Sequence, residues 1–110
     1  MTTDSNTKKL LFDILTPLAF YVRVTTKYWD LIVDIKHPVM QGHENTVKET
    51  LKNPDQIRAS KSDDSVFLFY RLQKPGRWIC AVTKRLNGDG FLVTTYPTDT
   101  IKEGTQIWPK

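Results

Sequence analysis

The pattern of apolar and polar positions divides the chain into short segments of helical and of strand character. Apolar residues at helical spacing predict a short helix over residues 8–15, and strict alternation over 18–25 predicts a half-buried strand. Helical spacing returns over 26–36, where Pro38 disfavours helical geometry at the residue before it. His37 is therefore expected at, or just beyond, the C-terminus of this helix.

The second half of the chain is dominated by predicted strands. A short helix over 44–52 and a short edge strand over 56–61 precede a three-strand meander at 66–97. One more extended piece is expected around 106–108. Helices and strands that are segregated in this order are typical of an α+β domain. We therefore expect a central antiparallel sheet of about four strands with helices packed on one side.

The length of 110 residues allows one hydrophobic core. Residues 1–17 are expected to form an N-terminal tail and short helix, with residues 1–6 loose, and residues 18–110 to form a single domain. No stretch reaches the ~20 apolar residues of a membrane span, and the start does not resemble a signal peptide. The expectation is a cytoplasmic protein without membrane contact.

Polar side chains interrupt the apolar pattern of the meander. Strands that bury one face usually keep cations at their ends, yet Arg71, Lys84 and the 94–96 triplet Thr-Thr-Tyr lie within the pattern itself. If the glycine-containing turns are the hairpin tips, Lys84 lies opposite Val93. Because side chains alternate, Lys84 then shares a face with Thr95, whereas the residues on either side of Thr95 lie on the opposite face.

These residue types suit a phosphodiester substrate. The chain has 16 Lys and Arg against 12 Asp and Glu, a net charge of +4, which fits a polyanionic partner such as RNA. Metal-independent RNA cleavage needs a base, an acid, and cations or hydroxyls that stabilise the phosphorane. His37 fits as acid or base, and a helix C-terminus favours its protonated form. The candidate phosphate and hydroxyl contacts are Arg58, Tyr70, Arg71, Lys84, Thr94, Thr95 and Tyr96.

Each feature also has a purely structural interpretation. A histidine before proline most often caps the last helix carbonyls, strand cations can extend to solvent without a ligand, and tyrosines are more often half-buried core residues. The single cysteine, Cys80, excludes an internal disulfide and is expected as an inert buried thiol. Two histidines and one cysteine give no useful ligand spacing, so neither a metal nor a cofactor is expected.

Five segments between residues 20 and 108 resemble a known family. They are His37-Pro38, VKETLKNPDQI at 47–57, FLFYR at 67–71, AVTK at 81–84 and FLVTTYPTDTIKEGTQIW at 91–108. Together they are similar to small phage and bacterial proteins of the barnase–EndoU–colicin–RelE class of ribonuclease folds. The resemblance implies a toxin-type ribonuclease that an antitoxin or immunity protein neutralises. Residue by residue, it implies catalytic roles for His37, Lys84, Thr94 and Tyr96, and weaker substrate-binding roles for Arg58 and Tyr70.

The leading expectation is a metal-independent endoribonuclease in which His37 and Lys84 are the principal residues. An alternative is a non-catalytic RNA-binding or regulatory module on the same scaffold. A third is a protein-interaction domain anchored by an exposed Trp78 or Trp108. The enzyme interpretation requires the histidine, the lysine and a threonine of the 94–96 triplet to converge on one concave face.

Overall fold

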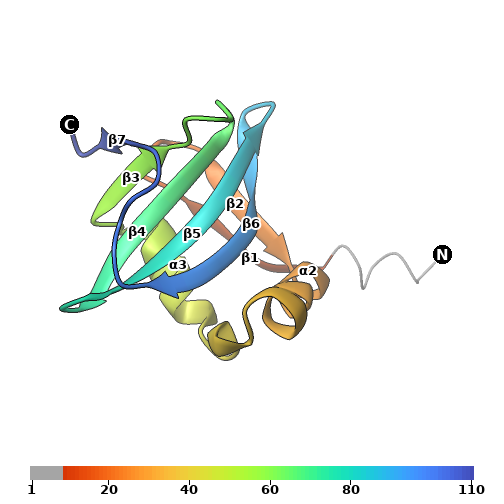
Figure 1. Cartoon of the computed structure of the whole chain (residues 1–110). Coiled ribbons are helices and arrows are strands. Elements are labelled where there is room, and N and C mark those ends of the chain that lie inside the picture. The colour runs from red at the N-terminus through yellow and green to blue at the C-terminus, as the bar shows by residue number, and fades with distance from the viewer. Residues whose placement is uncertain (1–8) are drawn as a thin grey trace.

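A seven-stranded mixed sheet organises the protein (Figure 1). The computed structural model describes residues 9–110, so the prediction for residues 1–6 lies outside the described part. The strands are β1 (Leu10–Leu15), β2 (Tyr21–Thr25), β3 (Gln56–Ala59), β4 (Val66–Lys74), β5 (Arg77–Leu86), β6 (Asp89–Thr98) and β7 (Thr105–Trp108). Their spatial order is β1-β2-β6-β5-β4-β3-β7, with β2 and β6 parallel and all other neighbours antiparallel.

The helices are short and lie between β2 and β3 along the chain. They are α2 (Thr26–Leu31), the π-helix η1 (Ile32–Lys36), the 3₁₀ turn η2 (Pro38–Met40) and α3 (Glu44–Lys52). Thr25 caps α2, because its hydroxyl accepts a hydrogen bond from the Tyr28 N–H at 3.1 Å. His37 follows η1 directly, so its predicted place at the end of this helix is confirmed.

The expectation of about four antiparallel strands flanked by helices is wrong, although the protein remains broadly α+β. Within the segment predicted as a helix over 8–15, residues 10–15 form strand β1 instead. Six residues of LLFDIL are too few to separate the two periodicities, and pairing with β2 buries Phe12 in the core. Strand β3 is not an edge strand, because it pairs with both β4 and β7.

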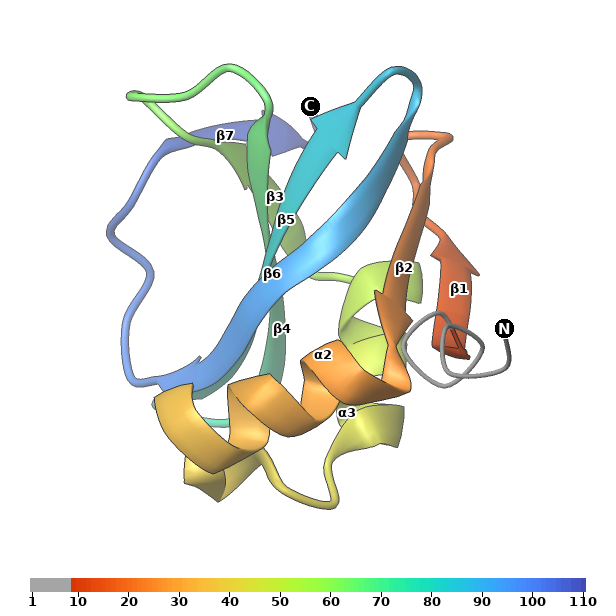
Figure 2. The same cartoon turned by 90° about the vertical axis from the view of Figure 1, so that its right-hand side faces the viewer.

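The sheet curls around α3, and the main core fills its inner face. Figure 2 shows β1 and β2 on one side and β3 and β4 on the other, with α3 between them. The Phe20 ring lies 5.7 Å from that of Phe67 and 6.3 Å from that of Phe69. The largest side chains that are fully buried include Phe20, Ile32, Met40, Val47, Leu51, Ile57, Phe69 and Leu92.

The opposite side of β4, β5 and β6, which we call the outer face, carries a second and smaller cluster. Leu68, Tyr70 and Cys80 are buried there. Residues 99–104, which we call the strap, connect β6 to β7 and cross this face in front of β4 (Figure 1). Ile101 of the strap packs against the cluster, so the outer face is covered in part by the chain itself.

Two β-bulges set the register of the meander. Gln73 is the extra residue in β4, and Val93 is the extra residue in β6. Lys84 therefore lies opposite Phe91 rather than Val93, so the predicted register is wrong by two residues at Lys84 and by one residue beyond the bulge, where Val82 lies opposite Thr94. The carbonyl of Val93 accepts a hydrogen bond of 2.8 Å from the Tyr28 hydroxyl, which links α2 to the bulge.

Gly104 holds the end of the strap against β3, and its substitution should destabilise the fold. Its φ is +79°, and a Cβ there would lie 2.5 Å from the Ala59 carbonyl oxygen. Gly76 has a similar φ of +75° but open space around it. We expect Gly104→Ala to lower the free energy of unfolding in urea by about 2 kcal/mol more than Gly76→Ala, because only the former adds a clash to the backbone strain. Equal losses would show that the contact with β3 is unimportant.

Candidate functional site

The outer face carries three of the four residues predicted to be catalytic. Thr94 pairs with Val82 and Tyr96 with Cys80, while Lys84 lies two residues beyond Val82 on the same strand. Because side chains alternate along a strand, Lys84, Thr94 and Tyr96 all point to the outer face. The predicted separation of Lys84 from the other two residues is thus wrong, because the Val93 bulge shifts the register between them.

His37 joins these residues at one end of the face. Its ring centroid lies 5.4 Å from that of Tyr96, with 41° between the ring planes. Its backbone N–H donates to the Ile32 carbonyl at 2.8 Å, which fixes the chain at the end of the helix. Lys84 lies four residues along β5 from the partner of Tyr96, or about 13 Å at the ordinary rise of a strand. The histidine and the lysine are therefore placed to contact different groups of an extended ligand.

Lys84 forms an ion pair with Asp63. Its Nζ lies 3.4 Å from Asp63 Oδ2, and both side chains are about two-fifths exposed. Hydrogen bonds from the hydroxyl and the backbone N–H of Ser65 lower the pKa of Asp63, so this carboxylate stays charged. An exposed pair of this kind contributes little to stability, so an incoming phosphate can compete for the lysine.

A row of three polar side chains crosses the middle of the outer face. Tyr70, Cys80 and Tyr96 lie opposite one another on β4, β5 and β6. Burial raises the pKa of both tyrosines, which therefore remain hydrogen-bond donors at neutral pH. Burial also raises the pKa of the Cys80 thiol to about 11, which leaves it inert as a nucleophile. Beside this row, the hydroxyl of Thr94 is buried without a hydrogen-bond partner in the described structure.

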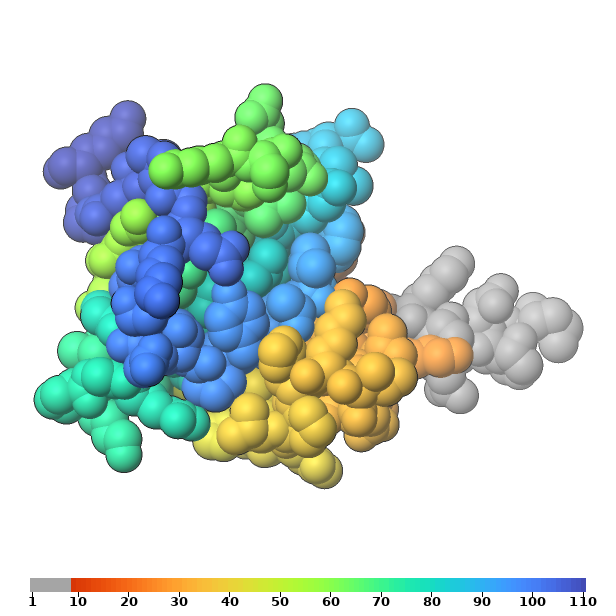
Figure 3. Space-filling model, in the orientation of Figure 1, coloured from red at the N-terminus to blue at the C-terminus, as the bar shows by residue number. Residues whose placement is uncertain are grey.

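Two cavities flank the strap. The first, of about 230 Å³, is lined by the two tyrosines of the row together with the strap residues Asp99, Lys102 and Glu103. The second, of about 270 Å³, shares Lys102 and Glu103 and reaches Leu68. Figure 3 shows the strap, in deep blue, lying over the sheet. The negative charge of Glu103 adds to the rise in pKa of both tyrosines, although burial and the neighbouring Cys80 contribute more.

Glu103 and Lys102 are site residues that the sequence analysis missed. The strap has no periodicity, and its carboxylates resemble those of any polar loop. The available signal was the TDTIKEG segment itself, which follows a strand that already carried candidate residues.

Arg58, which was predicted to bind substrate, anchors the strap in the structure. Its guanidinium donates to the carbonyls of Glu103 at 2.7 Å and Gly104 at 2.9 Å, and to Gln56 Oε1 at 3.0 Å. These hydrogen bonds hold the strap to the neighbouring strand β3. The role of Arg58 in this structure is therefore positional.

Two other predicted substrate-binding residues lie off the outer face. Arg71 donates to the carbonyl of Asn53 just after α3, and Thr95 is fully buried with its hydroxyl donating to the Cys80 carbonyl at 2.8 Å. Trp78 and Trp108 are half-buried rather than exposed, the first beside the outer cluster and the second against the main core. Neither tryptophan is presented as a free anchor.

Residues 9–110 contain no group of three His, Cys, Asp or Glu side chains arranged to hold a metal ion. No helix in the same range has the length and apolar character needed to cross a bilayer. Comparison of the chain with protein-family models, with curated proteins and with solved structures gives no match. The functional argument therefore depends on the chemistry of the outer face.

The buried thiol predicts a dependence of stability on alkaline pH. Because the pKa of Cys80 is about 11 in the folded protein and near 9.0 ordinarily, the unfolded chain loses this proton first, and the free energy of unfolding falls between these pH values. We expect Cys80→Ala to show a fall that is shallower by up to about 1.4 kcal/mol per pH unit in urea unfolding under reducing conditions. Parallel curves for the two proteins would contradict the assignment.

Proposed function

We propose that the outer face binds single-stranded RNA and cleaves its backbone without a metal ion, at the end where His37 contacts Tyr96. The observation that carries the proposal is the presence of Lys84, Thr94 and Tyr96 on one face of one sheet, with the His37 ring against Tyr96 at the end of that face. The resemblance noted for the sequence implies the same chemistry. It also implies a neutralising partner protein, which would act by covering this face.

The cleavage step needs two proton transfers. The 2′-oxygen forms a bond to phosphorus and loses its proton to a base, while the bond to the 5′-oxygen breaks and that oxygen takes a proton from an acid. His37 suits the acid, because an imidazole is a common proton donor in general acid catalysis and this ring lies beside Tyr96. Glu103 suits the base, because it is a carboxylate on the strap beside Tyr70 and Tyr96.

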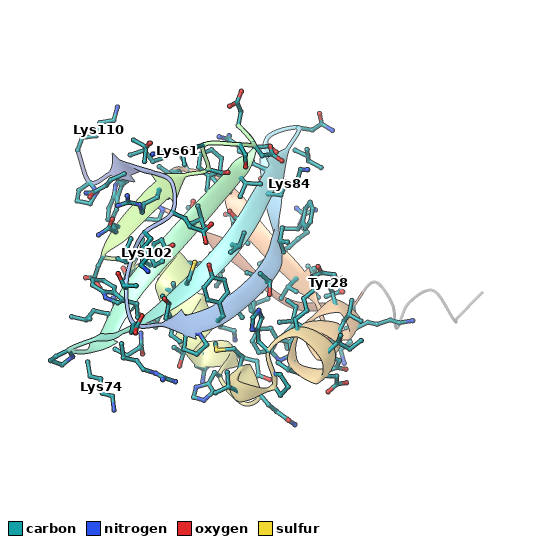
Figure 4. All side chains as sticks on the ribbon, viewed as in Figure 1. Tyr28, Lys61, Lys74, Lys84, Lys102 and Lys110 are labelled. Atoms are coloured by element: carbon teal, nitrogen blue, oxygen red, sulfur yellow. The ribbon has the colours of Figure 1, made fainter. Side chains whose placement is uncertain are left out.

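The remaining residues suit the stabilisation of charge. The hydroxyl of Tyr96 stays protonated because burial raises its pKa, so it can donate to a phosphorane oxygen. Lys84, about 13 Å along the strand, suits a neighbouring phosphate rather than the one that reacts. Lys61 and Lys102, labelled with Lys84 in Figure 4, add positive charge around the same face.

A second candidate function is RNA binding without cleavage. Two observations favour it: the hydroxyl of Thr94 is buried, and Lys84 is already paired with Asp63. On this view the basic residues hold phosphates and no proton transfer occurs. Salt-dependent retention of intact RNA would identify this function.

The cleavage proposal predicts distinct effects of two carboxylates on the strap. In EDTA, His37→Ala and Glu103→Gln should each lower the rate of cleavage of total RNA at least about 100-fold, as expected for loss of an acid or a base. Asp99→Asn is the matched control, because Asp99 lies on the same strap but does not contribute to the raised pKa values of the tyrosines. This variant should cleave RNA at the normal rate. Intact RNA with the unmodified protein, or equal rates for all three variants, would exclude the proposal.

The RNA-binding step can be tested separately at the lysine end of the face. Lys84→Ala should weaken RNA binding and reduce the slope of log affinity against log salt by about one, as expected for one lost phosphate contact. Asp63→Asn removes the competing carboxylate and should strengthen binding. Lys52→Ala, on the exposed end of α3, is the control. Binding would be located elsewhere if Lys84→Ala and Lys52→Ala had the same effect.

A further inference from the structure

The tip of the β4–β5 hairpin holds two like charges directly opposite each other. Lys74 pairs with Arg77 across the Pro75-Gly76 turn, so their Cβ atoms are about 5 Å apart. A pair of this kind is destabilising unless an opposite charge lies nearby. In the part of the chain that the structure describes, neither side chain forms an ion pair.

The bulge at Gln73 determines where this pair points. Leu72 and Trp78 face the outer side, and the extra residue in β4 turns Lys74 to the side of Arg77, away from the outer face. Without the bulge, Lys74 would continue the outer row and the two cations would not meet. The local distortion of the strand thus brings two cations together.

Both cations line a cavity of about 190 Å³ between the hairpin tip and α3. His43, which immediately precedes α3, and Thr46 of its first turn line the other side, with Gln73 beside them. None of the residues that line the cavity is acidic. Val39, Met40 and Ile79 supply the apolar part of the lining, and the polar part combines cationic side chains with hydroxyl and amide donors, which is the chemistry of an anion site.

Exposed cations at a hairpin end commonly have another purpose, since they discourage edge-to-edge association of sheets. That explanation requires only that the side chains reach solvent. It does not account for two cations on one side of the strand, converging with a histidine and a threonine from a different element on a single cavity. An anion in the cavity would relieve the repulsion that the register imposes.

We propose that this cavity binds a phosphate group. The group is either free phosphate or a phosphodiester of the RNA strand that occupies the outer face, and the second source rests on the function proposed above. Val39 lines the cavity and lies two residues from His37, so a strand that passes His37 can continue around this edge to the tip. Figure 4 places Lys74 at the end of the molecule opposite Lys84, so the two lysines mark the limits of an extended site.

The direct test follows inorganic phosphate by NMR of the full chain. Phosphate should shift the resonances of His43 and Thr46, and Lys74→Ala with Arg77→Ala should weaken this binding at least tenfold. A double variant at Lys52 and Lys110 removes the same charge from other exposed positions and should bind phosphate normally. The spectrum of each variant shows whether it is folded. Absence of these shifts in the unmodified protein, or equal affinity in both double variants, would overturn the proposal.

The source of the phosphate is tested with RNA of two lengths. If the cavity holds the RNA backbone, the tip variant should bind a ten-nucleotide strand at least tenfold more weakly and a dinucleotide with unchanged affinity. If it holds free phosphate, phosphate binding is lost while both RNA affinities stay the same, and this result also supports the site. If His37→Ala loses RNA cleavage but still binds phosphate, the cleavage site and the tip cavity are separate sites. If the unmodified protein never cleaves RNA but binds phosphate at the tip, the cleavage proposal fails and the phosphate site stands.

Discussion

The parallel pairing of β2 with β6 is the contact on which the sheet depends. It spans only two residue pairs, Val22 with Gly90 and Arg23 with Phe91, yet it joins the first hairpin to the meander. Gly90 permits it, because a Cβ there would lie 3.0 Å from both the Phe20 ring and the Lys84 carbonyl oxygen. Beyond this short pairing β6 bulges at Val93, and α2 rather than β2 lies beside it, with the Tyr28 hydroxyl donating to the Val93 carbonyl. Without that one junction, β1 and β2 would not belong to the sheet that encloses the core.

The sequence predicted the elements that depend on local periodicity. The helix over 44–52 and the strands of the meander are present because their apolar faces repeat at a single period over enough residues. Residues 10–15 form a strand because their partner, β2, lies on the far side of a turn that a six-residue pattern does not encode. The β2–β6 pairing joins segments nearly seventy residues apart, so no local signal indicated it.

The candidate site was predictable in its residue types and not in its geometry. His37 was placed by the proline that follows it, which is a local constraint. Lys84 and Thr94 share a face only because of the bulge at Val93, which the sequence did not indicate. One extra residue in β6 switches the face to which each following side chain points. The role of Arg58 depends on carbonyls of the strap about forty-five residues away, so its sequence neighbours carried no sign of it.

The strap also limits the shape of any polymer that reaches the tyrosine row. It is a continuous stretch of chain that is tied to the sheet at both ends, and the spaces beside it measure about 230 and 270 Å³. Spaces of this size are too small for a double helix, whereas the unstacked bases of a single strand can be splayed into pockets one at a time. If the outer face binds RNA as proposed, this loop would also act as a gauge of strandedness, because an unpaired strand can lie beside it whereas a paired stem is held off.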